Sequence, residues 1–262
     1  MMPPWVVRDR LRMSDTLLKG TDIMTQPYDP YAAPVPPGED RRLDAVDSVT
    51  QGWRALAGSL LSWVLAFLLI LVVTVGATLT LVIPIALTET PDEDRAVALA
   101  PATVAVVIVV YAVLIVLSLL WTLNVYRNSV RQVQGESVAV ADFFRVRGLG
   151  LPLVAYLLMS LTVAVGMVLL VIPGLLAAFF LMYVPYLACS RPEAGLAAAF
   201  RGSAAVARAN PGASLLLLLF SLLLNVVGGV MVVGVLITTP LAACMMAYAA
   251  LRGSGDRFVH RP

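Results

Sequence analysis

Few side chains in this sequence of 262 residues could carry out acid–base, nucleophilic or metal chemistry. The single histidine, His260, lies close to the end of the sequence, and the two cysteines, Cys189 and Cys244, lie in apolar segments. A zinc site or a nucleophile–base pair needs several such groups close together. Phosphate-loop and dinucleotide-turn motifs are also missing from the sequence. We therefore predict no catalytic residue, no metal site and no cofactor, and we expect that the protein is not an enzyme.

Arginines between the apolar segments are the groups that could bind a charged ligand. A guanidinium group binds phosphate through paired hydrogen bonds, so these side chains could contact the head groups of anionic lipids. Alternatively, they only orient and anchor the protein, because each basic residue gains about 1 kcal/mol beside an anionic leaflet. The candidates are Arg127, Arg131, Arg145, Arg147, Arg201 and Arg208.

The composition indicates a membrane protein. The chain is 60% hydrophobic and 13% charged, whereas a soluble domain carries about 25% charged residues. The formal net charge is only +2, so no general attraction to nucleic acid follows. Uncharged segments cover residues 55–88, 96–126, 148–190 and 209–251.

Segment length predicts the number of spans. A spanning helix needs about 20 residues, and a helix as long as either of the last two segments would extend about 65 Å, twice the hydrocarbon core. We therefore expect a reversal in each, at Pro173–Gly174 and at residues 225–229, where the sequence reads NVVGG. The prediction is an all-α, polytopic bundle with six transmembrane helices at about 58–83, 100–124, 152–172, 175–190, 212–227 and 230–251.

Basic residues give this layout one orientation. Of the 18 Lys and Arg residues, the six-span arrangement leaves only Arg95 on the outer side. Because basic residues are enriched in cytoplasmic loops, we predict a multi-pass protein of a bacterial cytoplasmic membrane with both termini in the cytoplasm. Translation is expected to start at Met13 or Met24, with a start at Met1 and a genuine disordered extension as the alternative, and no secretory signal peptide is expected.

The segments outside the spans divide the chain further. Residues 1–43 are predicted to be a disordered, Pro-rich tail, 44–252 the transmembrane domain and 253–262 a short cytoplasmic tail. An amphipathic helix is expected over 44–57. Two cytoplasmic interfacial helices are expected, one over 190–212 that begins with a Ser190–Glu193 capping box and one within 135–148. Pro185 is expected to kink the fourth span.

Uncharged polar residues inside the spans allow two interpretations. They could line a path for a neutral solute, or they could bond neighbouring helices or the preceding turn of their own helix, which is their usual role. They are Ser62, Thr74, Thr103, Ser118, Asn124, Ser160, Thr162, Ser221, Asn225, Thr238 and Thr239.

The second half of the chain resembles a known group of proteins. The motifs VIPGLLAAFFLMYVPYLA and PEAGLAAAFRGSAAVARANPGASLLLL, with TTPLAACMMAYAALRG near the end, resemble a poorly characterised bacterial family of six-span proteins. That family is related to the membrane region of glycerophosphoryl diester phosphodiesterases, and the composition looks actinobacterial. The resemblance implies the six-span fold but not the phosphodiesterase activity.

Two functions follow as hypotheses. The first is a non-enzymatic accessory or scaffold protein in envelope or lipid handling, with membrane lipids and unidentified membrane proteins as partners. The alternative is a transporter or flippase for a lipid-like or neutral solute, which would need a cavity near the middle of the membrane lined by the polar residues named above.

Overall fold

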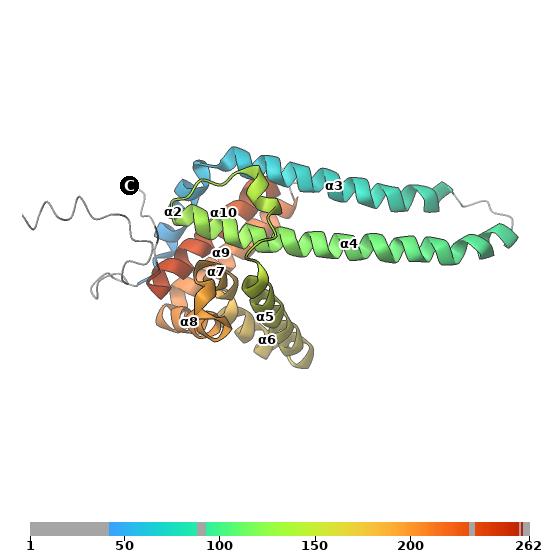
Figure 1. The fold of residues 1–262 in the computed structure, drawn as a ribbon. Helices are drawn as coiled ribbons and strands as arrows, with labels where there is room; N and C mark the ends of the chain where they lie inside the picture. The colour runs from blue at the N-terminus through green and yellow to red at the C-terminus, as the bar shows by residue number, and fades with distance from the viewer. Residues whose placement is uncertain (1–41, 88–92, 231–233, 257, 259–262) are drawn as a thin grey trace, which may run out of the picture. The chain divides into compact units, whose positions relative to one another are not determined.

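The computed structural model describes residues 42–87, 93–230, 234–256 and 258, all within the unit formed by residues 37–262. Nearly all of the predicted N-terminal tail, with Met13 and Met24, lies outside the described residues. Within them the chain is helical and contains no strand. The helices are α2 (Ala45–Ala57), α3 (Leu60–Leu87), α4 (Glu93–Val133), α5 (Gly150–Leu169), α6 (Val171–Leu181), α7 (Val184–Ser190), α8 (Leu196–Ala209), α9 (Pro211–Val230) and α10 (Val235–Ser254) (Figure 1).

The described part of the chain has six helices that are long and apolar enough to cross a membrane. They are formed by α3, α4, α5, α6 together with α7, α9 and α10. This confirms the predicted all-α, six-span fold. The helix α10 is the central element, because 61% of its apolar window is buried and it packs against α2, α4, α9 and α3.

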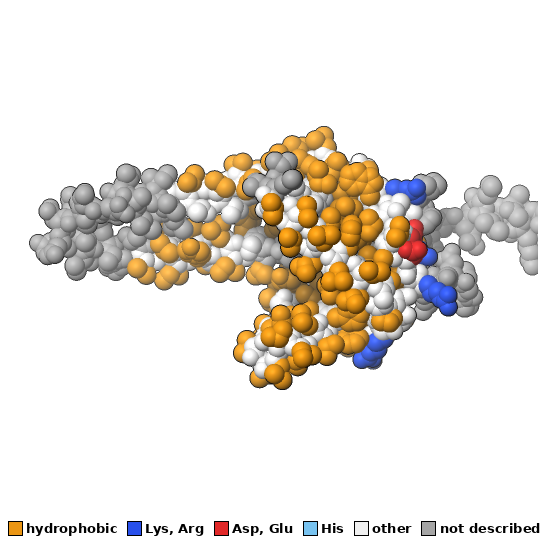
Figure 2. All heavy atoms as spheres, turned by 180° about the vertical axis from the view of Figure 1, so that it is seen from behind, with side chains coloured by type: hydrophobic (Ala, Val, Ile, Leu, Met, Phe, Trp, Pro, Cys, Tyr) orange, Lys and Arg blue, Asp and Glu red, His pale blue; other side chains and the backbone are white. Residues whose placement is uncertain are grey.

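The surface divides by polarity as a membrane protein requires. Large apolar side chains are exposed along α3, α4, α5 and α9, for example Ile108 and Leu161, where lipid tails can solvate them. Charged side chains gather at one end of the face shown in Figure 2, while hydrophobic ones predominate over the rest of the described part of that face. We call this end, which carries Arg127, Arg191 and Arg252 at or near the ends of α4, α7 and α10, the basic end.

The predicted reversal at Pro173–Gly174 is wrong. The chain turns at Leu170, which is extended (φ −159°, ψ 133°), and both residues lie in the first turn of α6. Proline is tolerated there because the first amides of a helix have no intrahelical partner. A Cβ on Gly174 would lie 2.6 Å from Met167 N, so this glycine permits close packing of α5 and α6 and not the turn.

The predicted reversal at residues 225–229 is also wrong. These residues belong to α9, which continues to Val230. Gly228 again serves close packing, because a Cβ there would overlap Thr238 Oγ1 on α10. Helix pairs in membranes use small residues in this way, and the sequence alone does not distinguish such a residue from one in a turn.

The fourth span is interrupted, as the position of Pro185 predicted. The helix α6 ends at Leu181, and α7 begins at Val184 with Pro185 in its first turn. The side chain of Ser203 on α8 serves both sides of the break: its Oγ donates to Phe180 O (2.7 Å) and accepts from Tyr183 N (3.2 Å). Backbone groups freed inside a membrane protein need such partners.

Of the two predicted interfacial helices, only α8 forms a regular helix. It begins at Leu196 after Gly195 (φ 81°), and the predicted Ser190–Glu193 capping box is absent because Ser190 ends α7. Its buried face, which includes Ala199, Ser203 and Ala207, packs on α6, α7 and α10. Residues 135–148 contain only the short 3-10 helix η1 (Val140–Phe144).

The segment around η1 is held by aromatic packing that the sequence analysis missed. Phe143 lies edge-on to Trp63 of α3, with ring centroids 4.7 Å apart. Trp63 is fully buried and donates from Nε1 to Gln132 Oε1 (2.7 Å). Two buried polar groups therefore join α3 to the end of α4.

The predicted amphipathic helix over 44–57 is confirmed as α2. Asp44 caps its first turn by accepting from Val46 N (2.8 Å). The helix packs against α10 and buries Ser48 and Gln51, while Trp53 and Arg54 stay exposed.

Candidate functional site

A cavity of about 630 Å³ lies among α4, α5, α6, α7, α9 and α10. The helices α5 and α6 pack closely on each other, as do α9 and α10, whereas few contacts join the two pairs. Figure 1 shows α5 and α6 diverging from α4. The cavity therefore arises where the two hairpins and α4 separate, and its volume is in the usual range for a small-ligand site, about 300–1,000 Å³.

The lining is apolar with a few uncharged polar groups. Methionine and alanine side chains make up much of it, together with Trp121, Tyr126 and Tyr186. Among the residues that the structure describes, no Asp, Glu, Lys, Arg or His contributes to it. The polar side chains besides tyrosine are Thr122, Ser160, Ser221, Asn225 and Thr239, and four of them belong to the polar residues that the sequence analysis named.

Three of the four serine and threonine hydroxyls at the cavity differ from those elsewhere in the spans; the fourth, Thr122, donates to Ser118 O (2.8 Å) on its own helix. Outside the cavity, the polar side chains of Thr74, Ser118, Asn124, Thr162 and Thr238 each donate to a carbonyl of their own helix. Among the described residues, Ser160, Ser221 and Thr239 make no hydrogen bond through their side chains. Of the intramembrane polar residues named from the sequence, Ser62 is the one other described serine without such a bond. Thr103 lies outside the side chains that the structure describes. Three of the four unbonded hydroxyls therefore meet in one cavity.

Asn225 adds a further acceptor. Its Nδ2 donates to Ser221 O (2.7 Å), which leaves the amide oxygen free to accept a bond from a ligand. The buried Ser221 Oγ has no hydrogen-bond partner within the described part of the chain. An unbonded polar group in a membrane interior is costly. Because Ser221 Oγ is shielded from solvent, a ligand would bond it only after the side chain rotates into the cavity.

The helix geometry gives the distance of each polar group from the basic end. With a rise of about 1.5 Å per residue, Ser160 and Ser221 lie about 15 Å along α5 and α9 from the basic end. Asn225 and Thr239 lie about 21–22 Å from it by the same measure. In a hydrocarbon core about 30 Å thick that begins at the basic end, Ser160 and Ser221 would lie near the centre, whereas Asn225 and Thr239 would lie closer to the opposite side. Tyr126, beside Arg127, lines the opposite part of the cavity, nearer the basic end.

Two of the predicted lipid-contacting arginines are neutralised within the protein. Arg131 Nε lies 2.7 Å from Glu136 Oε2, and Asp142 Oδ1 lies 3.4 Å from Arg131 Nη1 and 3.2 Å from Arg145 Nη1. Burial raises the pKa of Asp142, but the Ala139 amide and the two arginines outweigh it, and the net pKa is below the ordinary value. Arg131 and Arg145 therefore support the η1 segment.

The other predicted arginines have no acidic partner among the described residues. Arg127 Nη1 donates to Arg147 O (2.8 Å), which brings these two together at the basic end. On α8, Arg201 Nε donates to Ala197 O, and Arg208 lies over the Phe180 ring, 5.5 Å from its centroid. These side chains keep their positive charge available to an anionic surface.

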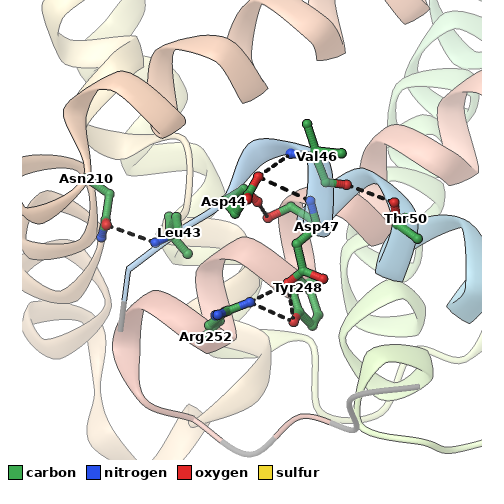
Figure 3. Close-up of polar contacts among 9 residues, drawn as sticks. Leu43, Asp44, Val46, Asp47, Thr50, Asn210, Tyr248 and Arg252 are labelled. Atoms are coloured by element: carbon green, nitrogen blue, oxygen red, sulfur yellow. Dashed lines mark hydrogen bonds and ion pairs between the residues drawn. The ribbon is translucent and has the colours of Figure 1, made fainter. Parts of the chain in front are cut away.

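A polar network that the sequence analysis missed ties α2 to the basic end (Figure 3). Asp47 on α2 accepts from Tyr248 Oη (2.9 Å) and pairs with Arg252, both on α10. Asn210, between α8 and α9, accepts from Leu43 N (2.9 Å). The residues are far apart in sequence, and no motif links them. Their bonds fix α2 against α10 and make it part of the bundle.

In the described part of the chain, no group of three His, Cys, Asp or Glu side chains could hold a metal ion. Cys244 is buried and Cys189 is half-buried, and within the described residues neither forms a disulfide. In the predicted C-terminal tail, Asp256 is buried, pairs with Arg191 and accepts from Ser190 Oγ.

Comparison with known proteins finds distant relatives. The chain is 32% identical over 150 residues to the uncharacterized protein Rv2560 of Mycobacterium tuberculosis and to the uncharacterized protein Mb2590 of Mycobacterium bovis. The match covers 57% of this chain and 46% of each relative, so the chain spans about half the length of the curated relatives it matches. No family model matches the chain, and no solved structure matches it at a significant level.

These relatives support one part of the predicted resemblance and leave another part without support. Both are mycobacterial, in keeping with the actinobacterial character of the sequence. Neither name mentions glycerophosphoryl diester phosphodiesterases, and that relation stays a prediction.

Proposed function

We propose that this chain is a non-enzymatic multi-pass protein of a bacterial cytoplasmic membrane that binds a lipid-like molecule in the cavity between its helix pairs. The observation that carries the proposal is the meeting of three unbonded hydroxyls, from Ser160, Ser221 and Thr239, in one apolar cavity. A ligand there would satisfy groups that lipid tails cannot. The role is then accessory, in lipid or envelope handling.

The arginines support the orientation that this function assumes. Arg147, Arg201 and Arg208 lie outside any ion pair of the described residues, and basic residues favour the cytoplasmic face. The basic end is therefore proposed to face the cytoplasm, with both termini on that side. The same side chains are proposed to contact anionic head groups there.

Transport is a second candidate, favoured by the depth of the polar groups. Substrate sites of secondary transporters lie close to the bilayer midplane, and Ser160 and Ser221 of this cavity would lie at about that depth. A flippase would move the lipid-like molecule to the other leaflet, whereas an accessory protein would hold or present it. Reconstitution with a labelled lipid distinguishes the two.

Filling the cavity tests the proposal. Ala164→Leu with Ala178→Leu adds bulk to two lining positions, and Ala105→Leu with Ala112→Leu adds the same bulk to the exposed face of α4. Each full-length protein is extracted gently, and co-purified molecules are measured by native mass spectrometry. We expect the wild type and the α4 variant to carry bound lipid and the filled variant to lose it. Equal bound lipid in the filled variant and the wild type would refute the proposal.

A further inference from the structure

The cavity offers hydrogen bonds but no charge, and this limits the chemistry of its ligand. Ser160, Ser221 and Thr239 can each donate and accept, and the Asn225 amide oxygen can accept. The nearest arginine in sequence, Arg127, is not part of the lining and donates from Nη1 to Arg147 O. The polar groups that the described lining offers to a ligand inside the cavity are therefore uncharged.

Desolvation makes this lining selective. A phosphate or carboxylate that left water for the cavity would lose its hydration without meeting a cation, which is far more costly than burial of a hydroxyl or ester. The depth adds to this cost, because Ser160 and Ser221 lie about 15 Å along their helices from the basic end, which is half the thickness of the hydrocarbon core. An alcohol or ester group would instead gain hydrogen bonds from side chains that have none.

We propose that the cavity binds the uncharged polar end of a neutral lipid, an alcohol or ester such as the glycerol end of a diacylglycerol, and discriminates against lipids that carry a phosphate. This inference rests on the proposed function, that the cavity binds a lipid-like molecule. The acyl chain of the ligand would lie along the apolar part of the lining, where Met159, Met182 and Met246 provide adaptable contacts. The arginines of the basic end would then serve the surrounding anionic leaflet and not this ligand.

The test compares two lipids that differ only by the phosphate. Delipidated full-length protein is titrated with dioleoylglycerol and with dioleoyl phosphatidic acid, and binding is followed by native mass spectrometry. We expect dioleoylglycerol to bind at least about tenfold more tightly, because removing the phosphate removes an uncompensated charge. Equal or tighter binding of phosphatidic acid at the cavity would overturn the inference.

Variants locate the binding groups. Ser221→Ala with Thr239→Val removes two unbonded hydroxyls, and we expect it to weaken dioleoylglycerol binding about tenfold. The matched control is Thr162→Val, which removes an exposed hydroxyl that bonds Leu158 O on its own helix, and it should leave binding unchanged. An equal loss in both variants would contradict the assignment.

Different results would refute the proposed function and the neutral-lipid inference. If neither lipid binds the wild type, or if Ala164→Leu with Ala178→Leu leaves the binding of both unchanged, the proposed function fails and the inference falls with it. If the filled variant loses both lipids while phosphatidic acid is the tighter ligand of the wild type, the proposed function stands and only the neutral-lipid inference is overturned.

Discussion

Replacement of Gly174 by alanine should destabilise the α5–α6 hairpin. A Cβ at this position would lie 2.5 Å from Met167 Cγ and 2.6 Å from Met167 N. The side chain of Met167 could move, but its backbone nitrogen is part of α5, so the two helices would have to separate. Overpacking of this kind costs about 1–3 kcal/mol, and alanine regains about 0.5–1 kcal/mol over glycine in a helix. The net loss should be about 1–2 kcal/mol, roughly a tenfold shift of the unfolding equilibrium.

Equilibrium unfolding in mixed micelles with increasing dodecyl sulfate measures this loss. Gly76→Ala on α3 is the matched control, because a Cβ there would meet nothing within 4 Å. The control should be as stable as the wild type or slightly more stable. If Gly174→Ala is at least as stable as the wild type, the close approach of α5 and α6 is not as described, and the corrected position of the turn at Leu170 loses its physical reason.

Other parts of the bundle give further predictions. Trp63→Phe removes the indole N–H that donates to Gln132 Oε1 in a buried site, and unfolding in the same micelles should show a loss of about 1–3 kcal/mol. The folded-state pKa of Asp142 is below its ordinary value of 3.8. The stabilisation that this carboxylate provides should therefore be complete above about pH 4 and be lost as the pH falls through the lower, folded-state pKa. The Asp142→Asn variant should lack that part of the pH dependence of the unfolding free energy. Arg201→Gln with Arg208→Gln should reduce the preference for anionic over neutral lipids in the retained annulus, by about 1 kcal/mol for each charge, as measured by lipid analysis of the purified protein; an unchanged ratio would contradict the proposed head-group contacts.

Spans were predictable because charge and length are local properties of the sequence. Each uncharged segment is bounded by charged residues, and two segments were too long for one helix. The exact turns were not predictable in the same way. Gly174 and Gly228 have the residue type of a turn but serve helix packing. The described glycines with positive φ are Gly135, Gly148, Gly195 and Gly255, and both predicted turns lie elsewhere.

The candidate site was predictable only in part. Ser160, Ser221, Asn225 and Thr239 belong to a longer set of intramembrane polar residues, and nothing in the sequence separates them from the rest. All four residues line one cavity, which exists because the two helix pairs diverge. No residue pattern in the sequence indicates that divergence. The buried contact of Trp63 with Gln132 was missed for a similar reason, since tryptophan near a span end is equally typical of the membrane interface.

The most direct test of the central claim is to find where a bound lipid lies. A neutral lipid with a photoreactive group near its polar end is added to the full-length protein in nanodiscs, crosslinked by light and located by peptide mass spectrometry. The account predicts crosslinks at the cavity-lining segments of α5, α9 and α10, including the peptides that contain Ser160, Ser221 and Thr239, and their loss in Ala164→Leu with Ala178→Leu. Crosslinks confined to the exposed surfaces of α3 and α4, or unchanged in the filled variant, would contradict it.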